Sequence, residues 1–214
     1  MNIVLYKDGL IKKAGNFHGS GNINMTKKIL RQHFLAQRKA FSPKIIETKS
    51  QQITNQLFDF FDFSELNVIH TFLPIVANHE INTWLIINKI WTHFSQLTVV
   101  VPKSNFVNYT LQSYILKKDT HICENQWHIP EPVNAQRMDD QEIDIVLLPL
   151  ICFDKCGFRV GYGKGFYDRF LTRCRADVVK VGLSFFPPVH QIEDIHSLDI
   201  KMDYCVIVGE VFKF

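Results

Sequence analysis

The chain lacks several features that would place it in other classes of protein. Its longest apolar runs are far shorter than the roughly 20 residues of a membrane-spanning helix, so we expect no such helix. The first residues contain no continuous apolar stretch of the kind found in a signal peptide. The formal net charge is only +3, which disfavours a dedicated nucleic-acid-binding protein. We therefore expect neither a membrane nor a nucleic acid as a partner.

Cysteine is scarce and irregularly placed. The five cysteines are odd in number and follow no regular spacing, so they predict no disulfide framework and favour a reducing cytoplasm. Cys152 and Cys156 are four positions apart, but the sequence has no second pair with the spacing of zinc ligands. We therefore expect packed thiols rather than a metal–thiolate site. We also expect the protein to be a monomer.

Most of the chain has the composition of an ordinary globular protein, with 46% apolar and 21% charged residues. Residues 1–24 differ, because they are rich in Gly, Asn and Lys and show no periodicity. We expect them to be an extension that is not native or is poorly ordered, with Met25 as the natural start. The alternative is a short edge strand at residues 3–6. Residues 25–214 are expected to form a single catalytic α/β domain.

Helical and strand-like segments alternate along residues 25–214. Apolar periodicity and capping signals predict helices at 27–41, 43–60, 81–94 and 166–175. Apolar or alternating runs predict strands at 67–72, 97–101, 107–116, 143–150, 178–185 and 204–208, with Pro102 ending the second and Glu131-Pro132 in a polar loop. This order predicts a three-layer α/β domain with a largely parallel, Rossmann-like sheet flanked by helices. Such sheets bind ligands at the carboxyl ends of their strands.

The most informative segment is 147–171, LLPLICFDKCGFRVGYGKGFYDRFL. Glycines alternate through 161–165, with Lys164 among them and Arg159 before them. Glycines let the backbone approach an anion closely, and the basic side chains supply positive charge. The helix expected next adds its positive dipole end. We interpret the segment as a phosphate cradle of a nucleotide-binding protein; the alternative is a glycine-rich connection needed only for tight turning.

This glycine segment is neither of the two common nucleotide motifs. A P-loop needs Gly-x4-Gly-Lys-Ser/Thr, but Phe158 and Gly165 stand at positions where that pattern requires glycine and Ser or Thr. The spacing GxGxG also differs from the dinucleotide fingerprint GxGxxG, and no acidic residue ends the next strand near Leu183.

Residues 149–168 resemble one family. The 5-formyltetrahydrofolate cyclo-ligases, also called 5,10-methenyltetrahydrofolate synthetases, carry the pattern P-G-hydrophobic-A-F-D-x-x-G-x-R-L-G-x-G-x-G-Y-Y-D. The chain departs from it at Leu150, Cys152, Val160 and Phe166. The resemblance implies an enzyme that converts 5-formyltetrahydrofolate, ATP and Mg²⁺ to 5,10-methenyltetrahydrofolate, ADP and phosphate. A reduced folate and ATP are then its substrates.

The resemblance also implies which residues bind ATP. Family members begin with a Lys-x-x-x-Arg helix that contacts ATP, and Lys27 and Arg31 fit its spacing, with Lys28 as a less favoured substitute. Without the family, such a basic helix face is usually only solvated. The remaining ATP-binding residues are expected in the glycine segment: Arg159, Gly161, Tyr162, Gly163, Lys164, Gly165, Phe166 and Tyr167. Two of them, Arg159 and Lys164, are expected to be catalytic by neutralising charge on the transferring phosphoryl group.

A second set of residues is expected at the folate. Glu80 matches a family glutamate that holds the pterin or formyl end, and Ile75 would line the same pocket. Tyr162 and Phe166 would be shared between nucleotide and folate. From the residues alone, Glu80 stands before a predicted helix and could simply favour its N-terminus. Glu131-Pro132 resembles a family dipeptide.

The family holds Mg²⁺ through two aspartates, one after the motif tyrosine and one before the last strand. Asp168 matches the first and Asp199 the second, with Asp203 as the alternative to Asp199. Two protein carboxylates suffice because Mg²⁺ also takes substrate phosphates and waters. Without the family, Asp168 reads equally well as a carboxylate at the start of a helix.

Two other functions remain open from the sequence. The chain could be a non-catalytic relative that binds a nucleotide or RNA, or an enzyme of a related sheet that acts on a sugar phosphate. The joint presence of Lys27, Arg31, Glu80, Arg159 and Asp168 argues against lost catalysis. No residue is identified as a general base.

Overall fold

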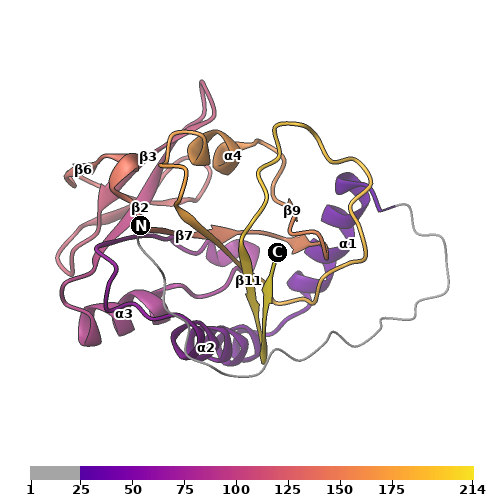
Figure 1. The fold of residues 1–214 in the computed structure, drawn as a ribbon, viewed down its shortest axis with the longest axis horizontal. Helices are drawn as coiled ribbons and strands as arrows, with labels where there is room; N and C mark the ends of the chain where they lie inside the picture. Colours follow the sequence, from indigo (N-terminus) through magenta and orange to yellow (C-terminus); the bar gives the residue numbers. More distant parts are fainter. Residues whose placement is uncertain (1–24) are drawn as a thin grey trace.

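A computed structural model describes residues 25–214 of the chain (Figure 1). Its centre is an eight-stranded sheet with the strand order β12-β11-β10-β7-β1-β2-β3-β6. The five middle strands are parallel: β11 (Tyr204–Ile207), β10 (Val179–Leu183), β7 (Ile145–Pro149), β1 (Val68–His70) and β2 (Thr98–Asn105). The outer strands are antiparallel to their neighbours: β12 (Glu210–Lys213), β3 (Thr110–Ile115) and β6 (Arg137–Met138). The expected α/β fold with a largely parallel sheet is confirmed.

Helices cover both faces of the sheet and make three layers (Figure 1). Helices α2 (Pro43–Phe60) and α3 (Trp84–His93) lie on one face, and the short α4 (Phe166–Leu171) lies on the other. Helix α1 (Lys27–Lys39) packs beside the hairpin of β8 (Cys152–Phe153) and β9 (Arg159–Val160). The two 3₁₀ turns are η1 (Val76–Asn78) and η2 (Asp140–Glu142). The expectations for residues 1–24, the extension and the edge strand, lie outside the described residues.

The core forms because the central strands are apolar on both sides. Along β7, Ile145 and Leu147 face the cluster that includes α2 and α3, whereas Val146 and Leu148 face the cluster that includes α4. All four side chains are fully buried. A parallel strand covered on both faces is expected to be continuously apolar. None of the helices in the described part is long and apolar enough to cross a membrane.

Several expected boundaries were wrong. Strand β2 does not stop at Pro102 but continues to Asn105, paired there with β3 alone. Its pairing with β1 ends at Val100, so within residues 25–214 the proline lies where only one side of β2 is paired with another strand, as in an edge strand. The Glu131-Pro132 pair is not in a loop, because β5 (Pro130–Pro132) forms a hairpin with β4 (Ile122–Glu124).

The ends of two helices also differ from the expectation. Helix α3 begins at Trp84, three residues late, because the residues just before it are not helical and His79 has a left-handed backbone. Helix α4 ends at Leu171, so it spans only 6 residues and its dipole is correspondingly small. Strand β12 was not expected at all. It is short and half-buried, so it carries little of the apolar pattern that identifies a strand.

His70 is a polar residue in the middle of this core. Its side chain is fully buried in β1 and lies with ring centroids 4.6 Å from Phe170 and 5.8 Å from Tyr167. Neither ring nitrogen has a hydrogen-bond partner within the described residues. Burial disfavours the charged imidazolium and lowers the pKa of His70 to about 3.

This burial predicts a loss of stability in acid. The unfolded chain takes up a proton near pH 6.5, whereas folded His70 stays neutral until about pH 3. The stability linked to His70 is therefore fully present above pH 6.5 and is lost as the pH falls, by about 2 kcal/mol near pH 5. The free energy of unfolding, measured with urea above pH 6.5 and near pH 5, should fall less on acidification in His70→Leu than in the unmodified protein. The same substitution at exposed His190 is the control, and an unchanged acid loss in His70→Leu would contradict the assignment.

Candidate functional site

A cavity of about 630 Å³ opens at the carboxyl ends of β1, β2 and β7. Segments following those strands, the start of α1 and the glycine segment line it. Its lining includes every residue that the sequence predicted for the site: Lys27, Lys28, Arg31, Ile75, Glu80, Arg159, Gly161, Tyr162, Gly163, Lys164, Gly165, Phe166, Tyr167, Asp168 and Asp199. Asp203 is not among the lining residues, and it pairs with Lys180. The expected placement of ligands at the strand ends thus agrees with the cavity, while the individual roles stay predictions.

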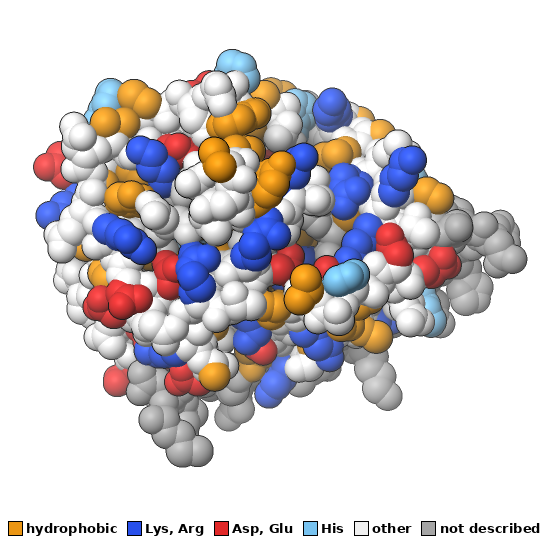
Figure 2. Space-filling view, turned by 90° about the horizontal axis from the view of Figure 1, so that it is seen from above, with side chains coloured by type: hydrophobic (Ala, Val, Ile, Leu, Met, Phe, Trp, Pro, Cys, Tyr) orange, Lys and Arg blue, Asp and Glu red, His pale blue; other side chains and the backbone are white. Residues whose placement is uncertain are grey.

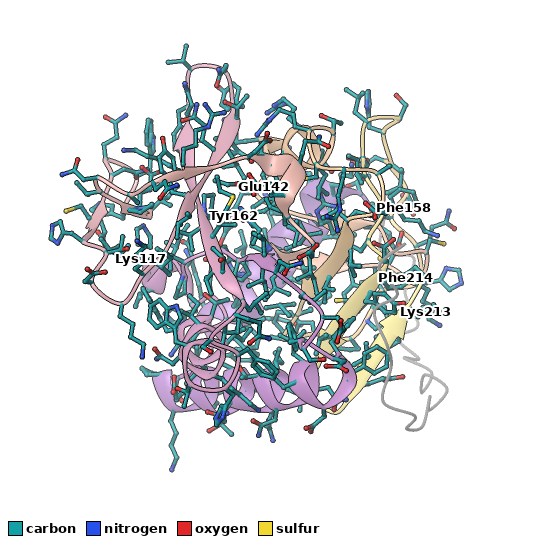
Figure 3. The ribbon with its side chains drawn as sticks, turned by 60° about the vertical axis from the view of Figure 1, so that its left-hand side comes forward. Lys117, Glu142, Phe158, Tyr162, Lys213 and Phe214 are labelled. Atoms are coloured by element: carbon teal, nitrogen blue, oxygen red, sulfur yellow. The ribbon has the colours of Figure 1, made fainter. Side chains whose placement is uncertain are left out.

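The turn before the glycine segment is built on a buried carboxylate. Asp154 accepts hydrogen bonds from the backbone N–H groups of Cys156 and Phe158, both at 2.9 Å, and of Ile192 at 3.1 Å. Gly157 has a φ of +89°, and a Cβ there would lie 2.6 Å from Cγ of Phe214. Figure 3 shows Phe158 and Phe214 in the same region of the molecule. The turn reverses the chain and directs β9, with Arg159, toward the cavity.

The glycines of 161–165 serve two different purposes. Gly163 has a φ of +91°, and a Cβ there would lie 3.2 Å from Nη2 of Arg31, so the backbone and the close approach both favour glycine. At Gly161 a Cβ would meet nothing within 4 Å. Gly161 lines the cavity, so the absence of its side chain leaves open space beside the backbone. That space suits a ligand that approaches the main chain closely.

Arg159 is held in place by a carboxylate and a carbonyl group. Its Nη2 donates to Oδ1 of Asp168 at 2.7 Å, and its Nη1 donates to the carbonyl oxygen of Ile200 at 2.5 Å. The backbone N–H of Ile200 also donates to Oδ1 of Asp168, at 3.1 Å. Asp168 therefore lies next to the residue that follows Asp199. Burial lowers the pKa of Arg159, and the charges of both aspartates oppose that effect.

Lys27 and Arg31 join α1 to the same site. The Lys27 ammonium forms an ion pair with Asp199, and its backbone N–H donates to Oδ1 of Asp194 at 2.6 Å. Nε of Arg31 donates to the carbonyl oxygen of Gly161 at 2.7 Å. The basic face of α1 is thus in contact with the site rather than merely solvated. Figure 2 views the molecule from above, and Lys and Arg side chains gather near the middle of this face and toward α1.

The two aspartates fit a magnesium ion only together with another ligand. Within residues 25–214 there is no group of three or more His, Cys, Asp or Glu side chains that could hold a metal. Asp168 and Asp199 are instead neutralised by Arg159 and Lys27. Two carboxylates are enough for Mg²⁺ when a phosphate group and water complete its shell. The donor set therefore fits Mg²⁺ bound with a nucleotide rather than Mg²⁺ alone.

Glu80 does not cap a helix, contrary to the reading from its position alone. It lies between the 3₁₀ turn η1 and α3, outside any helix, and its Oε2 accepts a hydrogen bond from the backbone N–H of Ile75 at 2.8 Å. Its Oε1 accepts from the hydroxyl of Tyr162. Only 6% of Glu80 is exposed, and burial raises its pKa. The carboxylate is therefore fixed at the cavity wall by two donors.

An aromatic wall of the cavity was missed in the sequence. The rings of Phe106 and Trp127 stack with centroids 3.5 Å apart, and Phe166 lies edge-on to Phe106 at 5.1 Å. Trp127 remains 47% exposed. A tryptophan in a polar loop was the available signal, but Phe106 comes from another hairpin, so the stack could not be read from spacing. The wall offers flat apolar faces to a planar ligand.

Comparisons with known proteins agree on one family. Residues 23–202 match the model of the 5-formyltetrahydrofolate cyclo-ligase family. A mitochondrial 5-formyltetrahydrofolate cyclo-ligase of Arabidopsis thaliana is 26% identical, with 69% of this chain and 57% of that protein aligned. The 5-formyltetrahydrofolate cyclo-ligase of Haemophilus influenzae is 34% identical, with 54% of this chain and 62% of that protein aligned. The matched part thus spans less than two thirds of either relative.

A solved structure shows the same fold. The 5,10-methenyltetrahydrofolate synthetase of Aquifex aeolicus superposes with a TM-score of 0.73 and 24% sequence identity. The superposition covers 87% of this chain and 92% of that one.

The buried carboxylate of Asp154 is predicted to be essential for stability. Asp154→Ala leaves three backbone N–H groups without their acceptor, two in the turn and that of Ile192. We expect a loss of about 3 kcal/mol in the free energy of unfolding, measured by urea denaturation. Asp119→Ala, at an exposed loop position, should change it by less than about 0.5 kcal/mol. Equal effects of the two substitutions would show that the turn does not depend on Asp154.

Proposed function

The chain belongs to the 5-formyltetrahydrofolate cyclo-ligase family, and on this premise we propose that it closes the ring of 5-formyltetrahydrofolate to give 5,10-methenyltetrahydrofolate. ATP is the co-substrate, and ADP and phosphate are released. The observation that carries the proposal is the gathering of the basic residues, Glu80 and the paired aspartates around one cavity. We also propose that the protein is cytoplasmic, in keeping with its five free cysteines, and that it is a monomer.

The proposed reaction explains why a charged cavity is needed. The oxygen of the N5-formyl group is a poor leaving group. Transfer of the γ-phosphoryl group of ATP to that oxygen releases ADP and converts the oxygen into a leaving phosphate. The N10 lone pair then attacks the formyl carbon, phosphate departs with the former formyl oxygen, and the N10 proton is lost. The protein mainly has to hold the reactants in line and neutralise the phosphoryl charge.

The basic residues are suited to the phosphate groups. Lys27 and Arg31 reach the cavity from α1, and Lys164 extends from the glycine segment with an exposed side chain 5.6 Å from the Tyr109 ring centroid. Arg159 is more fixed, because Asp168 and Ile200 already hold it. We propose that Lys27, Lys28, Arg31 and Lys164 bind the ATP phosphates and that Arg159 and Lys164 offset charge on the transferring group. The Gly161–Tyr167 backbone lies beside them.

The folate would occupy the other side of the cavity. Glu80 is fixed at the wall and can accept hydrogen bonds from the N–H groups of the reduced pterin. Ile75 is its backbone donor and lines the same wall. Tyr162 belongs to the glycine segment and donates a hydrogen bond to Glu80, and Phe166 lines the same cavity, in keeping with contacts to both substrates. The stacked Phe106 and Trp127 offer a surface for the planar parts of the folate.

Mg²⁺ is proposed to bind with the nucleotide. Asp168 and Asp199 would hold it, and the ion would neutralise phosphate charge when bound. Their present partners, Arg159 and Lys27, are themselves suited to phosphate. A bound phosphate would compete for these two cations, and Asp168 and Asp199 would then be the carboxylates that hold the ion.

The proposed activity predicts an ATP-dependent absorbance change with 5-formyltetrahydrofolate. Lys164→Ala should lower kcat/KM for ATP by about 1–3 kcal/mol of transition-state stabilisation, because a charged partner of the phosphates is lost. Lys117→Ala is the matched control, since Lys117 lies at the periphery, away from Tyr162, in Figure 3. If the unmodified protein shows no turnover, the proposed cyclo-ligase activity is refuted and a non-catalytic relative is favoured. If Lys164→Ala and the control have the same kcat/KM for ATP, Lys164 does not bind the ATP phosphates.

The proposed metal ligands predict a selective change in the Mg²⁺ requirement. Asp168→Asn should raise the Mg²⁺ concentration for half-maximal turnover at saturating ATP, and Asp199→Asn should do so less strongly, because each removes a carboxylate charge. Asp203→Asn is the control, because Asp203 pairs with Lys180 and does not line the cavity. If Asp203→Asn raises the Mg²⁺ concentration for half-maximal turnover and Asp199→Asn does not, the second metal ligand is Asp203 rather than Asp199.

A further inference from the structure

The last turn of α1 carries a buried arginine that neither the glycine motif nor the basic Lys-x-x-x-Arg pattern includes. Arg38 is only 4% exposed. Its Nη2 donates to the Tyr162 hydroxyl oxygen at 2.6 Å, and its Nη1 donates to the carbonyl oxygen of Leu150 at 3.5 Å. Within residues 25–214 it makes no direct ion pair with a carboxylate. A buried guanidinium is expensive to desolvate, so its position calls for a physical reason.

The contact with Tyr162 has a defined direction. A guanidinium can only donate hydrogen bonds, so the Tyr162 oxygen accepts from Arg38 and its own O–H is left to donate. The acceptor of that O–H is Oε1 of Glu80. The three side chains thus form a chain that starts at α1, passes through the glycine segment and ends on the carboxylate at the cavity wall. In Figure 3, Tyr162 lies near the centre of the view.

Two arginines of helix α1 form hydrogen bonds with adjacent residues of the glycine segment. Arg31 and Arg38 are two helical turns apart and so lie on the same face of α1. Arg31 binds the backbone at Gly161, whereas Arg38 binds the side chain of Tyr162. A displacement of α1 would therefore move both the backbone and the hydroxyl group that meets Glu80.

The charge of Arg38 also acts on Glu80. Burial raises the pKa of Glu80, and the hydrogen bonds from Tyr162 and Ile75 and the charge of Arg38 oppose this effect. The titratable groups that face Glu80 are Tyr162 from the glycine segment, Arg38 from α1 and Tyr167 from α4. Arg38 is the only cation among these three. It therefore favours the ionised, hydrogen-bond-accepting form of Glu80.

We propose that Arg38 is a positioning residue that holds the Tyr162 hydroxyl against the Glu80 carboxylate, and so couples the nucleotide-facing helix α1 to the folate side of the cavity. The folate part of this inference rests on the proposed function. Arg38 acts through Tyr162 and does not itself line the cavity. Folate affinity then depends on a residue of the nucleotide-facing helix that touches neither substrate.

The first test measures binding of each substrate. Arg38→Met and Tyr162→Phe should each raise the dissociation constant of 5-formyltetrahydrofolate about tenfold, as expected for one broken charged hydrogen bond. Arg38→Met should change that of ATP by less than about twofold. Arg38→Lys keeps the charge and should recover part of the folate affinity. Lys39→Met, at the exposed neighbouring position of α1, is the control.

The double variant Arg38→Met/Tyr162→Phe separates coupling from general damage. If Arg38 acts through Tyr162, the double variant should bind folate no more weakly than the worse single variant. Effects that add in full would overturn the proposal. A weaker affinity for ATP with unchanged folate affinity in Arg38→Met would overturn it too.

A second test needs no substrate, so it stays decisive if the proposed function fails. Glu80 has a raised pKa in the folded protein, so its protonated form gives stability that is present below its ordinary pKa and is lost as the pH rises. Arg38→Met should steepen this loss in urea unfolding as the pH is raised above the ordinary pKa of a glutamate, because Glu80 loses its compensating cation. In a Glu80→Gln background the steepening should disappear. A steepening that persists there would show that Arg38 does not act on Glu80.

The two failures are distinguishable. An unmodified protein that does not bind or convert the folate refutes the proposed function, while the unfolding measurements still decide whether Arg38 acts on Glu80. An active unmodified protein whose Arg38→Met variant shows neither the folate effect nor the pH effect refutes the positioning role alone.

Discussion

The ion pairs Arg159–Asp168 and Lys27–Asp199 are the interactions on which the cavity depends. The first pair joins β9 to α4, and the second joins the start of α1 to the loop before β11 across 172 positions of the sequence. A cluster of uncompensated cations of this kind would repel itself, whereas paired charges hold the segments together before any ligand arrives. Phosphate is a strong competitor for the same lysine and arginine. The pairs therefore shape the cavity and also make the cations available to an anionic ligand.

The same region has to combine close packing with open space. Asp154 and Gly157 fix the turn, and Phe214 fills the place where a side chain at 157 would lie. A few residues later the requirement reverses, because the backbone beside Gly161 faces open space. A rigid turn followed by an open backbone holds a binding surface without filling it. The sheet makes this possible, since β7 is buried on both faces and supports the turn that follows it.

The sequence predicted best those features that depend on a local pattern of residue types. The alternation of apolar strands and amphipathic helices predicted the layered sheet, and the glycines with Arg159 and Lys164 predicted the segment that lines the cavity. Tertiary contacts decided the rest. Pro102 reads as a strand end, but its strand continues there, paired with β3 on one side only in the described part of the chain. Phe106 and Trp127 come from two hairpins, so no spacing along the chain reveals their stack.

Arg38 and Tyr162 show most clearly why part of a site escapes a motif. Position 162 is one of the variable positions of the family pattern, and Arg38 lies at the end of a helix whose first two turns carry Lys27, Lys28 and Arg31. Each alone reads as an ordinary polar side chain. Their meaning comes from hydrogen-bond direction, because an arginine donor forces the tyrosine to donate in turn to Glu80. A position that the pattern leaves open can thus orient a residue of the cavity wall, because the fold brings Arg38, Tyr162 and Glu80 within hydrogen-bonding distance.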